Sequence, residues 1–131
     1  MIKHIENPLV VSLSLTARLY PLSESWVEGT QNGAISSSGV SWTKRQNSPD
    51  IAWTSAGGTY AASLVATLTL PFGAAAQRYW EMDITPTVQE WVDGVRPNYG
   101  LVTLMTLGFD SATISSRESL HQEPRLLIST Q

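Results

Sequence analysis

Tryptophan is the residue type in this 131-residue chain with the greatest capacity to bind a ligand, and there are five. A flat indole suits the C–H face of a pyranose ring, and it equally suits a domain core, where large aromatic side chains are mostly buried. Trp80 and Trp91 take inward positions in an expected strand and helix, so we expect both in the core, and we expect Trp26 to pack on that helix. Trp42 and Trp53 lie in a loop-rich segment and are the better candidates for stacking on a ligand.

Three basic residues are candidates to complete such a site by holding a sugar carboxylate. Lys44 and Arg45 follow closely on Trp42, and Arg117 carries the planar guanidinium that binds a carboxylate in a two-pronged fashion. The alternative for the Lys44-Arg45 pair is a solvated turn. The alternative for Arg117 is an internal ion pair with Glu118 or Asp83 that fixes a loop. The predicted ligand-binding set is therefore Trp42, Trp53, Lys44, Arg45 and Arg117.

Carboxylates offer a second kind of site. Glu28, Asp83 and Glu118, with Glu24 as a further member, are oxygen donors of the kind that calcium prefers, and calcium takes six or more oxygens. No EF-hand or other calcium-loop spacing connects them, so they serve equally well as partners of arginine. We expect no cofactor, with calcium as the open alternative.

Catalytic patterns are absent from the sequence. There is no nucleophile elbow, no HExxH and no phosphate-binding loop, and His4 and His121 stand in an N-terminal arm and a polar loop. Cysteine is absent, which excludes a thiolate nucleophile, thiolate zinc sites and disulfides. We expect a protein that is not an enzyme.

Charge and hydropathy exclude further classes of partner. The net charge of -3 and the isoelectric point near 5.2 give no basic surface for nucleic acid. No apolar run has the length of a membrane span. The start of the chain lacks a charged region followed by an apolar one, so no signal peptide is predicted.

Three segments alternate between apolar and polar residues, which is typical of strands with one buried face. They are residues 9–20, 64–70 and 101–109. The last also carries Val102 and Leu104 on its second face, which favours a central position or contact with another chain. The main apolar faces are expected to hold Val11, Leu13, Leu15, Ala17 and Leu19; Leu64, Ala66, Leu68 and Leu70; and Leu101, Met105, Leu107 and Phe109 with Thr103.

Residues 79–94 predict a strand followed by a short helix. Residues 79–84 alternate, Thr85 is suited to cap a helix, and Pro86 fits the first helical position, where its missing N–H costs no hydrogen bond. Gly94 is suited to the left-handed conformation that ends a helix. The helix, at about residues 86–93, is too short to be stable alone and should cover one end of a sheet.

These elements predict an all-β fold, an antiparallel β-sandwich of jelly-roll type with one short capping helix. Residues 1–8 are expected to form an N-terminal arm, and residues 9–131 a single domain. Residues 125–130 are candidates for a last strand. Residues 31–60 are expected to hold long connections with short strand pieces.

Several motifs, taken in order, resemble the DNRLRE domain family over about residues 9–130. They are Glu24-Ser25-Trp26-Val27-Glu28-Gly29-Thr30, Val40-Ser41-Trp42, Trp80-Glu81-Met82-Asp83-Ile84-Thr85, Val88, Trp91, Gly94, Asn98-Tyr99-Gly100-Leu101, Phe109, Ser116-Arg117-Glu118 and Pro124-Arg125-Leu126. The resemblance implies a β-sandwich that is usually found in secreted or cell-surface chains, some of which bind carbohydrate, including alginate.

Two departures from that family lead to the functional hypotheses. Strands that normally precede the one at residues 9–20 are missing, and open sheet edges are readily completed by other chains. No export signal precedes the domain. We therefore expect a shortened relative or a fragment, acting as a non-catalytic structural or decoration module on a virion-like particle or a cell surface, completed by homo-oligomerisation or within a larger assembly. The alternative is a module that binds acidic polysaccharide.

Overall fold

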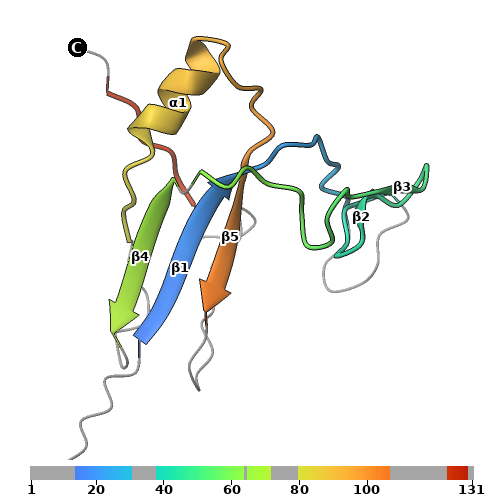
Figure 1. The fold of residues 1–131 in the computed structure, drawn as a ribbon, viewed down its shortest axis with the longest axis horizontal. Helices are drawn as coiled ribbons and strands as arrows, with labels where there is room; N and C mark the ends of the chain where they lie inside the picture. Colours follow the sequence, from blue (N-terminus) through green and yellow to red (C-terminus); the bar gives the residue numbers. More distant parts are fainter. Residues whose placement is uncertain (1–13, 31–37, 64, 72–79, 107–123, 130–131) are drawn as a thin grey trace, which may run out of the picture.

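A computed structural model describes most of the chain and shows a small β-rich fold. The residues described are 14–30, 38–63, 65–71, 80–106 and 124–129. Their elements are β1 (Ser14–Pro21), β2 (Lys44–Gln46), β3 (Ile51–Ala52), β4 (Ala66–Pro71), α1 (Thr85–Val92) and β5 (Leu101–Thr106). The strands form a three-stranded sheet in the order β4-β1-β5 and a separate β2-β3 pair (Figure 1).

The three-stranded sheet is antiparallel, with β1 in the centre. Directly opposed residues of antiparallel strands share a face. Ala17 stands opposite Leu68 on β4 and Met105 on β5, so the apolar faces predicted for the three segments lie on one side of the sheet. Ala17 and Leu19 are buried there, at 4% and 7% exposure. The alternation therefore predicted this face correctly.

The second face of the sheet is only partly apolar. Val102 and Leu104 of β5 are half-buried there, opposite Tyr20 and Arg18 of β1. On the first face Thr103 is exposed, although the alternation placed it among inward residues. β5 thus carries half-buried apolar side chains on both sides, but among the described residues it is an outer strand and not a central one.

The helix α1 has the predicted position and stop but a different start. It begins at Thr85, its N-cap is Ile84, and no side chain caps it, so the prediction that Thr85 is the N-cap is wrong. The Asp83 carboxylate accepts the Thr85 N–H at 2.9 Å instead. Beyond its last residue, Gly94 has a φ of +69° and its N–H bonds the Trp91 carbonyl.

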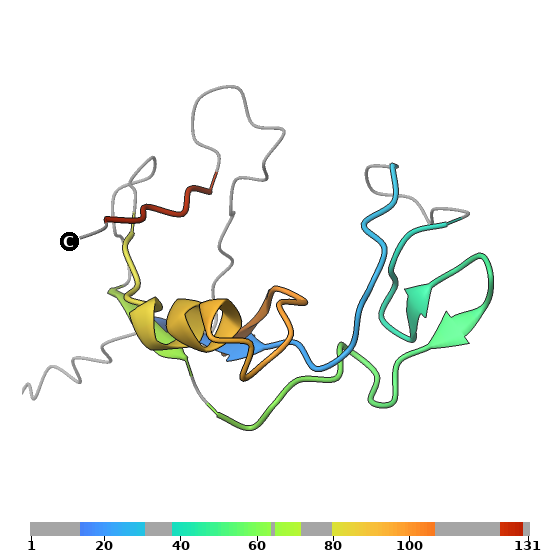
Figure 2. The same cartoon turned by 90° about the horizontal axis from the view of Figure 1, so that it is seen from above.

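A second bond completes the end of the helix, since the Val95 N–H donates to the Glu90 carbonyl at 3.0 Å. The two bonds together form a Schellman motif, which requires the left-handed residue that glycine supplies. In Figure 1, α1 lies beyond the end of the sheet at which β1 ends and β5 begins. Seen from above in Figure 2, it lies in front of that end. The expected short helix is therefore present at one end of the sheet.

Two predicted strands are not formed. Residues 80–84 are in no strand, and Trp80 is 39% exposed, although it was expected in the core. Trp91 is half-buried. Residues 124–129 form no strand either, and all are exposed. Alternation identifies the two faces of a segment, but a strand also needs a neighbour with which to bond, and no described strand pairs with either segment.

Other predictions lie outside the described residues. These concern the N-terminal arm at residues 1–8, the start of the first strand at residues 9–13, the end of the last long strand at residues 107–109, and the side chains of Arg117 and Glu118. Within the described ranges, no helix has the length and hydropathy that crossing a bilayer requires.

Replacing Leu19 tests the buried face. Leu19→Ala should lower the free energy of unfolding by about 2 to 4 kcal/mol, because it removes a buried side chain and leaves a cavity. Thr67 lies on the opposite, exposed face of the neighbouring strand, and Thr67→Ala should cost roughly 0.5 kcal/mol or less. Urea titration measures both. Equal losses in the two variants would contradict the assignment of faces.

Candidate functional site

The segment that continues β1 carries a lobe made of residues 38–60, which includes β2 and β3 (Figure 1). Backbone hydrogen bonds join the lobe to this segment. Val27 donates to Arg45 at 3.0 Å and accepts from Val40 at 2.7 Å, and Ser23 donates to Thr59 at 2.9 Å. The lobe lies on the β5 side of the sheet, away from β4 (Figures 1 and 2).

The Glu24 carboxylate adds side-chain hydrogen bonds between the lobe and the segment after β1. Glu24 accepts the Thr54 hydroxyl at 2.6 Å and the Thr54 backbone N–H at 3.1 Å. These bonds favour the charged carboxylate, with the Thr54 hydroxyl contributing most, and they hold the pKa of Glu24 below its ordinary value. Glu24 therefore joins the segment after β1 to residue Thr54 of the lobe.

A hollow of about 380 Å³ opens between the lobe and the sheet, and three tryptophans line it. Its size is within the range of roughly 300 to 1,000 Å³ that is typical of small-ligand sites. Trp26 comes from the segment after β1, Trp42 and Trp53 come from the lobe, and Leu101 and Val102 come from β5. The remaining lining residues are Leu22, Val40, Ser41, Gly57 and Gly58.

Trp42 is the most exposed of the three, at 72%. Its six-membered ring lies against Gly57: a Cβ added there would stand 2.7 Å from Cη2, 2.9 Å from Cζ3 and 3.0 Å from Cζ2. The Gly57 N–H also donates to the Trp42 carbonyl at 2.6 Å. Only glycine permits so close an approach, and at a φ of +86° it also adopts the backbone conformation at little cost. The ring is thus held on one side while most of its surface faces solvent.

The other two tryptophans are fixed by their indole N–H groups. Trp53 is 8% exposed and donates to the Ser41 carbonyl at 3.1 Å. Trp26 is 39% exposed and donates to the Tyr99 carbonyl at 2.9 Å, just before the start of β5. Trp53 forms the wall of the lobe, and Trp26 bonds the segment after β1 to the turn that enters β5. Hydrogen bonds of this kind restrict the orientation of both rings.

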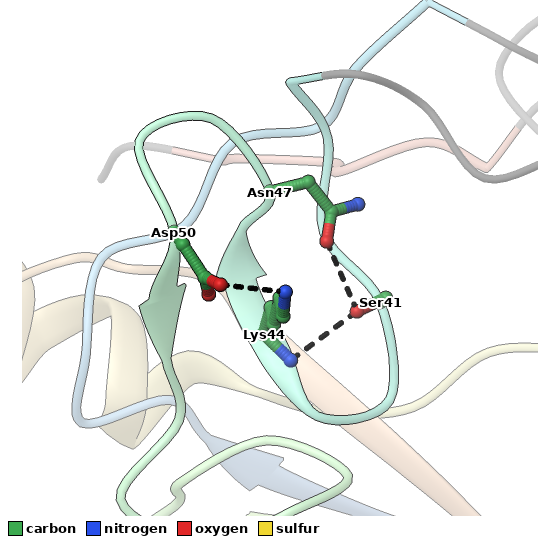
Figure 3. Close-up of polar contacts among 4 residues, drawn as sticks. All are labelled: Ser41, Lys44, Asn47 and Asp50. Atoms are coloured by element: carbon green, nitrogen blue, oxygen red, sulfur yellow. Dashed lines mark hydrogen bonds and ion pairs between the residues drawn. The ribbon is translucent and has the colours of Figure 1, made fainter.

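Lys44 is held by a neighbour within the lobe, and Arg45 is held by the segment after β1. The Lys44 ammonium pairs with Asp50 at 2.9 Å, while its backbone N–H donates to the Ser41 hydroxyl, which in turn donates to Asn47 (Figure 3). The Arg45 Nη1 donates to the carbonyl and to the hydroxyl of Ser25, at 3.0 and 2.9 Å. Both bonds fix Arg45 to the segment after β1.

No protein-family model, curated protein or solved structure matches this chain.

The structure brings together only part of the predicted ligand-binding set. Trp42, Trp53, Lys44 and Arg45 all lie in the lobe, and the two tryptophans line the hollow. Arg117 lies outside the described residues. The burial of Trp53 suits packing better than stacking, whereas the exposure of Trp42 suits stacking.

The predicted metal ligands are not gathered in the part of the chain that the structure describes. Glu28 and Asp83 are exposed, the Asp83 carboxylate accepts the Thr85 N–H, and Glu118 is not among the described residues. Hydrogen bonds from Thr85, first from its side chain and then from its backbone, hold the pKa of Asp83 below its ordinary value. The described residues contain no group of three His, Cys, Asp or Glu side chains that would hold a metal ion.

Two residues of the site were not predicted as such. Trp26 was expected to pack on the helix, and Gly57 was not among the predicted site residues. The available signal for Gly57 was the Gly57-Gly58 pair, which lies in the same loop-rich segment as Trp42 and Trp53. Glycine is often required where a ring approaches the backbone closely.

Substituting the two adjacent glycines separates the ring contact from the backbone strain. Both have positive φ, so alanine at either position should cost about 1 to 2 kcal/mol. Only at Gly57 does the new Cβ collide with Trp42; at Gly58 it meets Leu22 Cδ2 at 3.4 Å. Gly57→Ala should therefore change the near-ultraviolet circular dichroism of tryptophan and Gly58→Ala should not. Identical spectra for the two variants would show that Trp42 does not lie on Gly57.

Proposed function

We propose that this chain is a non-catalytic β module that binds carbohydrate at the tryptophan-lined hollow. The observation that carries the proposal is Trp42, which is 72% exposed and yet held against the Gly57 backbone. A large aromatic ring at the surface that is held in one orientation is suited to a flat partner. A pyranose ring offers such a face through its axial C–H groups.

Preorganisation favours this use of the ring. A ligand that stacks on a mobile side chain must order that side chain first, at about 0.5 to 1.5 kcal/mol for a rotamer-rich one. The contact with Gly57 favours one position of the Trp42 ring before a ligand arrives, and the indole hydrogen bonds of Trp26 and Trp53 restrict those two rings. Ligand binding then costs less free energy for ordering the side chains of the site.

The sequence resemblance to the DNRLRE family supports the same proposal, because some of its members bind carbohydrate. It also supports a two-layered jelly-roll sandwich as the complete fold, and a location at the surface of a particle or a cell. The module is proposed to be non-catalytic because the sequence carries no catalytic motif.

Removing the Trp42 ring tests the proposal directly. In affinity gels that contain soluble polysaccharides, at least one polysaccharide should retard the native chain, and Trp42→Ala should lower the affinity at least tenfold, or about 1.4 kcal/mol. Trp80 is also exposed and does not line the hollow, so Trp80→Ala should bind like the native chain. If no polysaccharide retards the chain, or if Trp42→Ala binds normally, the proposal is wrong.

A second candidate function is that of a structural module completed by copies of itself, as part of a larger assembly on a particle surface. Its support is the sheet: β4 and β5 are the outer strands, and neither pairs with a further strand among the described residues. An outer strand presents backbone N–H and C=O groups that another chain can pair with. The half-buried apolar side chains on both faces of β5 add to this support.

Light scattering coupled to size exclusion distinguishes this second candidate. Self-completion predicts a defined oligomer with a mass that is a multiple of 14.3 kDa. A folded, monodisperse species of 14.3 kDa at micromolar concentration would rule it out, and it would leave carbohydrate binding unaffected.

A further inference from the structure

Resting on the proposed function, we infer that the sugar seated on Trp42 is uncharged, so that the ligand is a neutral glycan rather than a uronate polymer. The first observation is the lining itself. Among the described residues that line the hollow, none is acidic or basic. A carboxylate placed there would lose its hydration without gaining a counter-charge, which is costly.

The basic side chains of the lobe are engaged elsewhere. The Lys44 ammonium is paired with Asp50, and Arg45 donates to the carbonyl and the hydroxyl of Ser25. Neither residue lines the hollow. A uronate seated in the hollow would therefore have no basic side chain of the lobe among the residues that line it.

The net charge of the chain acts in the same direction. The lobe itself, residues 38–60, is close to neutral, with Lys44 and Arg45 against Asp50. The whole chain carries -3. A surface of this sign repels a polyanion during approach and has no such effect on a neutral chain.

The hydrogen-bonding capacity of the site suits hydroxyl groups. The indole N–H groups of Trp26 and Trp53 are taken by the carbonyls of Tyr99 and Ser41. Within the described residues no acceptor bonds the indole N–H of Trp42. This donor lies at the edge of a side chain that is 72% exposed, where it can donate to a hydroxyl of a sugar stacked on the face. A neutral sugar can thus both stack and bond at Trp42.

Titration with two classes of oligosaccharide tests the inference. The intact chain is titrated, with tryptophan fluorescence as readout, against neutral hexamers of β-1,4-linked glucose, mannose and xylose and against hexamers of galacturonate and mannuronate, each at low and at high sodium chloride. At least one neutral hexamer should bind tenfold or more tightly than either uronate. Its Kd should change less than twofold with salt, because no ion pair contributes to binding.

The two possible failures are distinguishable. A uronate hexamer that binds more tightly than every neutral one, with an affinity that falls as salt is added, would overturn the inference and leave carbohydrate binding at Trp42 in place. No binding by any hexamer at millimolar concentration would count against the proposed function and the inference together.

Discussion

The contact between the Trp42 ring and the Gly57 backbone is the constraint on which the site depends. A tryptophan that is 72% exposed would ordinarily sample several rotamers, and its ring would present no defined surface. Here the closest ring atom lies 2.7 Å from the position that a Cβ of residue 57 would occupy, so the absence of that carbon is what admits the ring. One side of the indole is packed while much of the rest stays open to solvent. The packed side limits the positions of the ring, and the open side can contact a ligand.

This contact is maintained by interactions that lie farther from the hollow. The lobe carries both Trp42 and Gly57, and it is joined to the segment after β1 by backbone bonds and by the Glu24 carboxylate on Thr54. Trp26 then bonds that segment to the turn before β5 through the Tyr99 carbonyl. The hollow therefore lies between two bodies whose relative position is fixed by directional hydrogen bonds rather than by a large buried core. Such bonds are each worth about 1 kcal/mol, so several are needed to hold the arrangement.

The features that could be predicted from the sequence are the local ones. Alternation identified the buried face of β1, with Ala17 and Leu19, because the side-chain period of a strand does not depend on its partners. The position of α1 followed from Pro86 and Gly94, whose conformational preferences are intrinsic. Residues 80–84 alternate as well, yet they form no strand, because a strand also needs a bonded neighbour. The bond from Thr54 to Glu24 joins residues 30 positions apart, and no local pattern encodes such a pairing. The same holds for Gly57, whose role depends on where the lobe places Trp42.

Proton nuclear magnetic resonance of the free chain tests the central contact most directly. Because one Cα–H bond of Gly57 points at the Trp42 ring, the ring current should move that Hα resonance upfield, and nuclear Overhauser effects should join it to the protons on Cη2, Cζ2 and Cζ3 of Trp42. Gly58, next in the chain, should show neither effect from Trp42. Random-coil shifts for both Gly57 Hα protons, with no Overhauser effect to the indole, would contradict the account.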